Sequence, residues 1–211
     1  MRRVEWFGAL LIALVSIQGS AAEVGLVTAV SGKVMWQAEK TTPAELKPFV
    51  KVREGDQLTM NAAARVQVVY FESARQETWQ GAGALEIGSS SSKATKGNQQ
   101  PEAKTLPAIL VKQLAKTPSP DGNVKTGMIR LRSMTPSVEA VEKDYAEMRK
   151  QADGADRNPE LYLLASYFEL HEYARLETLL GKLNEESPAF PELAALNALY
   201  SRAVGLAKAE K

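Results

Sequence analysis

The chain has 211 residues, and at about 150 residues per domain this length predicts one or two small domains. Its 26 basic and 25 acidic residues nearly cancel, so charge gives no reason to expect nucleic-acid binding. The absence of cysteine excludes thiol catalysis, disulfides and Cys-ligated metal sites, and the single histidine excludes any site that requires two imidazoles.

The first 22 residues have the three-part layout of a secretory signal. Arg2 and Arg3 precede an apolar run at 6–15, and small residues lead up to Ala22. The run is shorter than the ~20 residues of a membrane span, so we expect export to the periplasm and cleavage after Ala22. An uncleaved anchor is the alternative, and it would be the chain's one contact with the membrane. Cleavage would leave equal numbers of basic and acidic residues.

Residues 23–90 favour β structure, because β-branched and aromatic residues recur in short runs between turn signals. At 65–71 the alternation places Val66, Val68 and Tyr70 on one face of a strand. Further strands are predicted at 24–30, 33–37, 49–52, 58–60, 78–79 and 84–87. About seven short strands at this spacing predict an antiparallel sandwich or a β-roll.

The motifs of this segment occur in a recognisable order. A Val-rich start ends in Gly32-x-Val34, a Gly55-Asp56-x-Leu58 turn follows, and then come the aliphatic strand at 64–71 and an apolar hairpin strand at 83–87. The order resembles the FecR-type periplasmic domain. In iron-transport regulators that domain receives a signal from an outer-membrane receptor and passes it to a cytoplasmic anti-sigma segment.

The chain departs from this family in two places. Glu72-Ser73-Ala74 stands where the family has an Asp-Gly-Ser turn, and without glycine we do not expect a positive-φ turn there. Only residues 1–5 precede the apolar run, so we expect no cytoplasmic output segment. The resemblance therefore implies at most the periplasmic half of the family's role.

The polar, low-complexity stretch 88–105 predicts a mobile segment, either a linker or a long loop inside the β domain. A short helix is predicted at 106–115, a turn at 117–123 and a further strand at 128–132. Arg130 and Arg132 on that strand could hold an anion, although a solvated strand face is the preferred interpretation. Because Thr135-Pro136 favours a helix start, we place the β domain at 23–134 and a helical domain at 135–211.

Helical periodicity covers the last third of the chain. Helices are predicted from about residues 136, 158 and 191, and a further helix is predicted around residues 176–183. The segment 163–188 is similar to a tetratricopeptide (TPR) hairpin in its apolar and proline positions. It departs from that repeat at His171, which replaces the inter-helix glycine, and at Leu164, which replaces a small residue. With one recognisable hairpin, we predict a TPR-like helical hairpin bundle that contacts a protein partner.

Candidate chemistry is sparse. Ser90-x-x-Lys93 and Lys125-Thr126-Gly127 match two of three motifs of the penicillin-recognising serine enzymes. That mechanism places the serine on a buried helix with the lysine one turn on, whereas Ser90 lies in the polar stretch. Trp36, Trp79 and Tyr70 would form a sugar-stacking patch if exposed, but in short strands we expect them in the core.

The sequence therefore predicts an α+β chain, with an all-β sandwich or β-roll followed by a TPR-like helical bundle. We expect a non-enzymatic exported envelope protein whose β domain binds, scaffolds or receives a signal, with an envelope protein as partner. A cell-wall-directed serine acyl-transferase using Ser90 and Lys93, and a glycan- or peptidoglycan-binding structural module, remain the alternatives. The candidate contact residues are Trp36, Trp79, Arg130 and Arg132, with no catalytic, cofactor or metal site predicted.

Overall fold

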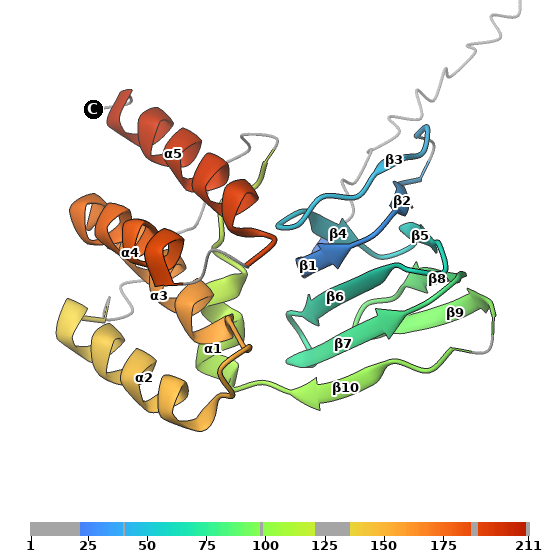
Figure 1. Cartoon of the computed structure of the whole chain (residues 1–211), viewed down its shortest axis with the longest axis horizontal. Coiled ribbons are helices and arrows are strands. Elements are labelled where there is room, and N and C mark those ends of the chain that lie inside the picture. Colours follow the sequence, from blue (N-terminus) through green and yellow to red (C-terminus); the bar gives the residue numbers. More distant parts are fainter. Residues whose placement is uncertain (1–21, 40, 98, 121–135, 187–189, 210–211) are drawn as a thin grey trace, which may run out of the picture.

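The structure is a computed structural model that describes residues 22–39, 41–97, 99–120, 136–186 and 190–209. Within these ranges the chain forms two five-stranded antiparallel sheets, followed by helices (Figure 1). An α+β chain with an N-terminal β part and a C-terminal helical part is thus confirmed.

Two sheets form the β part. Sheet A has the strand order β10-β7-β6-β1-β4. Its strands, in chain order, are β1 (Glu23–Ser31), β4 (Lys51–Arg53), β6 (Arg65–Tyr70), β7 (Arg75–Gln80) and β10 (Glu102–Thr105). Sheet B has the order β3-β2-β5-β8-β9. Its strands are β2 (Val34–Gln37), β3 (Ala44–Glu45), β5 (Gln57–Met60), β8 (Gly83–Ile87) and β9 (Ser92–Lys96).

The sheets face each other across an apolar core, as the period-two alternation of β6 predicts. Val66, Val68 and Tyr70 point inward from β6 and are fully buried. Sheet B contributes Leu58 and Leu85 to the same cluster. Because both sheets supply this cluster, the β part is a sandwich.

In the described ranges, five helices follow the sandwich: α1 (Ala108–Leu114), α2 (Val138–Gln151), α3 (Asn158–Glu169), α4 (Tyr173–Glu186) and α5 (Leu193–Ala209). The central helix is α3, which contacts α1, α2 and α4. Its first ten residues are all buried, as expected for a helix whose apolar residues cover most of its circumference.

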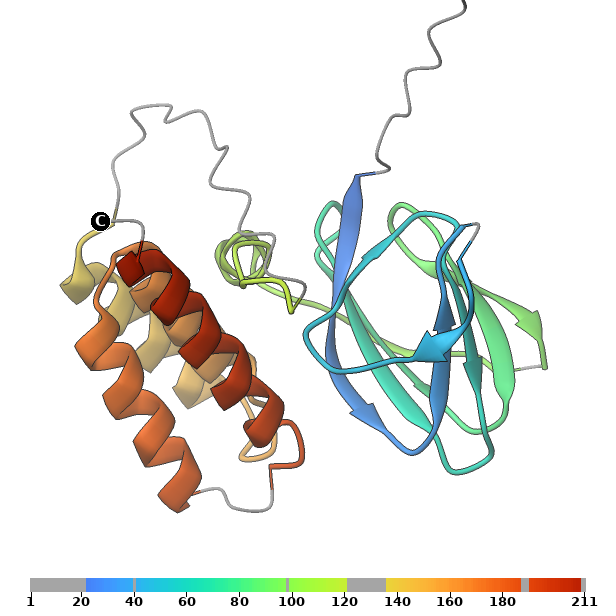
Figure 2. The ribbon, with the colours of Figure 1, turned by 90° about the horizontal axis from the view of Figure 1, so that it is seen from above.

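A second apolar core joins the helices to the outer face of sheet A. Leu26 and Val69 point outward from β1 and β6, and they lie in one cluster with Leu114, Leu164 and other helical residues. The α1 helix lies between the sandwich and the remaining helices (Figure 2). Although the sequence assigns this helix to the β domain, it packs against α3.

The polar stretch 88–105 is not the loop expected from its composition, because it contains β9 and β10. Both are edge strands, each paired with one neighbour only. An edge strand can be held by backbone hydrogen bonds while its side chains stay in water, so it needs no apolar alternation. The strand expected at 128–132 lies outside the described residues.

The start of α2 also differs from the expectation. The helix begins at Val138, and the Ser137 hydroxyl accepts a hydrogen bond from the Ala140 amide at 3.3 Å. Ser137 therefore caps the helix in place of the expected Thr135-Pro136 pair, because a serine side chain can satisfy a free first-turn amide.

Ala74 and His171 each adopt a positive φ in a turn without glycine. Ala74 has φ 54° in the β6–β7 turn, so the expectation that this turn would avoid a left-handed residue is wrong. His171 has φ 61° directly after α3, where its amide bonds Phe168 O at 3.2 Å and the Glu172 amide bonds Tyr167 O at 2.9 Å. This Schellman pattern usually places glycine where His171 stands.

Candidate functional site

The candidate site is a groove of about 690 Å³ at the junction of the sandwich and the helices. Sheet A forms its floor through β1, β6, β7 and β10. Its opposite wall is the α2–α3 connection, and its end is the segment 190–192 before α5. Figure 1 shows the start of α5 beside β1, which places that segment at the sheet.

Three side chains form a polar strip across the groove floor: Thr28, Gln67 and Thr78. Gln67 lies opposite Thr78 in the β6–β7 register, and a bulge in β1 lets Thr28 line the same groove. The Thr28 hydroxyl donates to Gln67 Oε1 at 2.8 Å, and Gln67 Nε2 donates to Thr78 Oγ1 at 3.3 Å. These bonds fix the orientation of the strip before any ligand arrives.

The opposite wall is tied to the sheet by two polar contacts. Asn158, at the start of α3, donates from Nδ2 to Gln76 Oε1 at 2.7 Å, and both residues are buried. Lys104 on β10 pairs with Asp156 at 2.7 Å. The amide of Asn158 also bonds Asp156 Oδ1 at 2.9 Å, so the wall is held at a fixed distance from the floor.

Glu192 closes the end of the groove. Its carboxylate accepts a hydrogen bond from the Val30 amide at 3.3 Å, which links the start of α5 to β1. Burial raises the pKa of Glu192 above its ordinary value, while its backbone hydrogen bonds and the nearby Arg65 guanidinium oppose the change. Next to it, Phe190 lies under the Arg157 guanidinium at 5.9 Å from the ring centroid.

This arrangement presents oriented hydroxyl, amide and carboxylate groups to a ligand. The two threonine hydroxyls are bonded to a glutamine amide, which is not a base that could take a proton from them. The described part of the chain also contains no group of three acidic or histidine side chains placed to hold a metal ion. The groups that line the groove can therefore form hydrogen bonds and ion pairs with a ligand.

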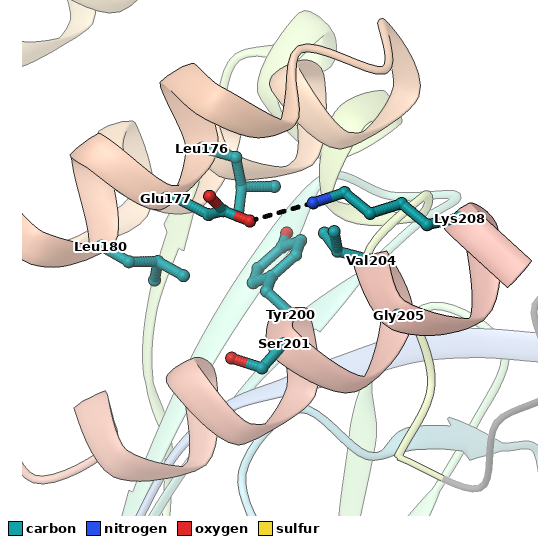
Figure 3. Close-up of a pocket in the computed structure, with 8 residues that line it drawn as sticks. All are labelled: Leu176, Glu177, Leu180, Tyr200, Ser201, Val204, Gly205 and Lys208. Carbon is teal, nitrogen blue, oxygen red and sulfur yellow. Dashed lines mark hydrogen bonds and ion pairs between the residues drawn. The ribbon is translucent and has the colours of Figure 1, made fainter.

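A second cavity of about 210 Å³ lies between α4 and α5 (Figure 3). Leu176, Leu180 and Val204 supply most of its apolar lining, and Glu177 pairs with Lys208 at 3.4 Å across it. Tyr200 is fully buried beside it, and its hydroxyl makes no hydrogen bond of good geometry among the described residues, although the Thr117 side chain lies close enough to lower its pKa. Burial raises the pKa of Tyr200 well above its ordinary range.

The aromatic residues considered for sugar stacking do not form a surface patch. Trp79 is 2% exposed and donates from Nε1 to Glu77 at 3.1 Å, and Tyr70 is fully buried in the sandwich. Trp36 is partly buried, and its Nε1 donates to Asp56 Oδ2 at 2.9 Å. Both indoles are therefore held in the sandwich by carboxylates. The predicted anion contacts Arg130 and Arg132 lie outside the described residues.

Ser90 and Lys93 do not share a helix. Ser90 lies in the turn between β8 and β9, where its carbonyl accepts from the Ser73 hydroxyl at 2.7 Å. Lys93 is an exposed residue of β9. In an extended strand, residues three apart point to opposite faces, so this segment does not place the lysine beside the serine. The third motif segment, 125–127, is outside the described ranges.

Sequence reasoning missed Glu77, whose side chain is 1% exposed inside the sandwich. Its carboxylate accepts from Arg75 Nε at 2.7 Å, Trp79 Nε1 at 3.1 Å and the Ser92 amide at 3.0 Å. It also missed the polar strip. Two of its residues, Thr28 and Gln67, stand between apolar residues in their strands, but that pattern indicated a face in water and not a groove.

Comparison of the chain with models of protein families, with curated proteins and with solved structures finds no match in any of the three. The FecR-type and TPR-like resemblances therefore rest on the sequence motifs. No helix in the described ranges has the length and apolar composition to cross a membrane.

Proposed function

We propose that this chain is a non-enzymatic protein of the bacterial envelope that binds a ligand or partner through the junction of its two parts. The observation that carries the proposal is the groove, whose floor comes from the sandwich and whose wall comes from the helical region. Concave sites of this kind occur preferentially at domain interfaces. A ligand seated there would contact both parts at once.

Binding is favoured over catalysis by the groups that line the groove. Gln67 is hydrogen-bonded to both threonine hydroxyls of the polar strip, so the hydroxyls have fixed orientations in which they can bond a ligand. Gln76 and Asn158 are paired in the same way. Side chains locked by mutual hydrogen bonds keep their geometry when a ligand arrives, which lowers the entropy lost on binding.

We further propose that the β part acts as a FecR-like module and the α3–α4 hairpin as a TPR-like surface for a protein partner. The positive φ of His171 supports the second proposal, because it occupies the glycine position of the repeat's inter-helix turn. The motifs of residues 23–90 support the first.

Export is proposed from the signal-like segment 1–22. The start of β1 at Glu23, directly after the expected cleavage site, supports it, because cleavage there would leave the sandwich whole. The mass of the protein recovered from the periplasmic fraction should correspond to a chain that begins at Glu23. Recovery of the full chain from the cytoplasm alone would contradict the proposal.

Affinity capture from an envelope extract with the purified full chain tests the binding role. We expect a defined protein partner, or a bound glycan, that a washed control resin does not retain. Recovery of neither would refute the binding proposal.

The enzymatic alternative has its own test. Covalent labelling by a fluorescent penicillin that disappears in Ser90→Ala would overturn the non-enzymatic proposal. A Ser89→Ala variant is the matched control, since Ser89 stands beside Ser90 outside the motif.

A further inference from the structure

We propose that the junction groove binds a neutral saccharide of a few sugar units, whose hydroxyl groups replace water along the polar strip of Thr28, Gln67 and Thr78. The inference rests on the proposed binding function and names the class of ligand for the same site.

The groove wall retains unused hydrogen-bonding capacity. The bond between Gln76 and Asn158 uses Gln76 Oε1 and Asn158 Nδ2. Gln76 Nε2 and Asn158 Oδ1 therefore have no partner among the described residues. The side-chain atom that is fully buried and unpaired in the described ranges is Tyr200 Oη, which lies elsewhere. The free amide atoms are therefore reached by water through the groove, and ligand hydroxyls can take the place of that water.

The floor favours hydroxyl groups over a peptide backbone. The strip lies on β1, β6 and β7, and each of these strands pairs on both sides in sheet A. A peptide could not extend the sheet here, because strand addition needs a free edge. The floor instead offers threonine hydroxyls and a glutamine amide, which both donate and accept. A sugar hydroxyl also does both, so it can pair with each of these groups.

Apolar and charged residues around the strip narrow the ligand class further. Leu161, Phe190 and Pro191 line the groove beside the polar groups and offer contacts to the carbon-bound hydrogens of a sugar ring. Acidic side chains outnumber basic ones along the lining, and one of the basic groups, Lys104, is already paired with Asp156. An anionic ligand would meet net repulsion, whereas a neutral one would not.

The size of the groove agrees with this class. Its 690 Å³ lies within the range of about 300–1,000 Å³ in which proteins hold small ligands.

Isothermal titration of the purified full chain with two neutral probes, the tetramers of N-acetylglucosamine and of glucose, tests the inference. We expect at least one tetramer to bind, and Gln67→Ala and Thr78→Val each to weaken it by tenfold or more. Thr59→Val is the matched control, because Thr59 is an exposed strand threonine of sheet B, and it should leave the affinity unchanged. Urea midpoints within error of the wild-type value would show that the variants fold.

The inference would be overturned if neither tetramer binds, or if binding is unchanged in both groove variants. Binding of an uncharged tetrapeptide in place of the sugars would also overturn it. These outcomes differ from failure of the proposed function. A protein partner captured from the envelope extract would sustain the binding role even if neither tetramer binds the groove. Penicillin labelling lost in Ser90→Ala would refute the non-enzymatic role regardless of sugar binding.

Discussion

Replacing Glu77 by alanine is expected to lower the free energy of unfolding by about 3–5 kcal/mol, the range for removing one partner of a buried charged network. The Glu77 carboxylate is 1% exposed and accepts three hydrogen bonds. Two of the donors, Trp79 Nε1 and the Ser92 amide, lie on different sheets, so the carboxylate links the layers of the sandwich.

The magnitude follows from what the substitution leaves behind. Trp79 Nε1 and the Ser92 amide would lose their acceptor, and each unsatisfied buried donor costs about 1–3 kcal/mol. Loss of the Cγ methylene adds about 0.8 kcal/mol. Arg75 adds little, because its side chain is 42% exposed and water can solvate it. The smaller donor costs together with this methylene give about 3 kcal/mol, the lower end of the expected range.

Urea denaturation followed by tryptophan fluorescence measures the loss. Glu86→Ala is the matched control. Glu86 is an exposed strand glutamate whose carboxylate accepts a hydrogen bond from Gln57, and its loss should cost less than about 0.5 kcal/mol. The stability loss of Glu77→Gln should lie between those of Glu77→Ala and Glu86→Ala. The glutamine amide keeps one acceptor oxygen, but its NH₂ group would face a hydrogen-bond donor. If Glu77→Ala costs no more than Glu86→Ala, the carboxylate does not link the sheets as described.

Three further substitutions test other features. His171→Gly should raise the free energy of unfolding by about 0.5–1 kcal/mol. The left-handed conformation costs a non-glycine residue about 1–2 kcal/mol, and the larger entropy that glycine loses on folding cancels part of this gain. The control Ala146→Gly in α2 should lower the free energy of unfolding by about 1 kcal/mol, and a loss of stability at both sites would refute the strain argument. Glu192→Gln should gain stability relative to wild type as pH rises above about 4.5. The pKa of Glu192 is raised in the folded protein, so the wild type loses stability as this buried carboxyl ionises, whereas the glutamine variant does not. A difference in urea midpoint between the two proteins that stays constant with pH would contradict this. Tyr200→Phe should leave the urea midpoint unchanged or raise it, because the buried hydroxyl forms no hydrogen bond of good geometry among the described residues. A loss above about 1 kcal/mol would show that the hydroxyl bonds the neighbouring Thr117.

Secondary structure was predicted best where burial requires apolar residues to recur at a regular spacing. The strand at β6 and the fully buried helix α3 were predicted because apolar residues must follow the geometry of the element that buries them. The prediction failed at β9 and β10, whose Ser, Lys and Thr residues are typical of a loop. Backbone pairing at an exposed edge leaves almost no trace in side-chain composition.

The candidate site was harder to predict for a topological reason. Thr28 and Gln67 are 39 residues apart, and Gln76 and Asn158 are 82 apart. Each residue alone reads as an exposed polar position, because its burial comes from a helical wall that the local sequence does not specify. Glu77 was missed for the same reason, since its buried state depends on Ser92 of the opposite sheet.

The apolar contact between sheet A and the helices has a consequence for how this chain could have changed over time. A sandwich copied into another protein without its helices would carry Leu26, Phe49 and Val69 into water, and all three are at most 1% exposed here. Exposed patches of that kind promote association or aggregation. Recombination would therefore be tolerated most easily when it moves the sandwich and helices as one inherited unit, even though each part has its own secondary-structure class.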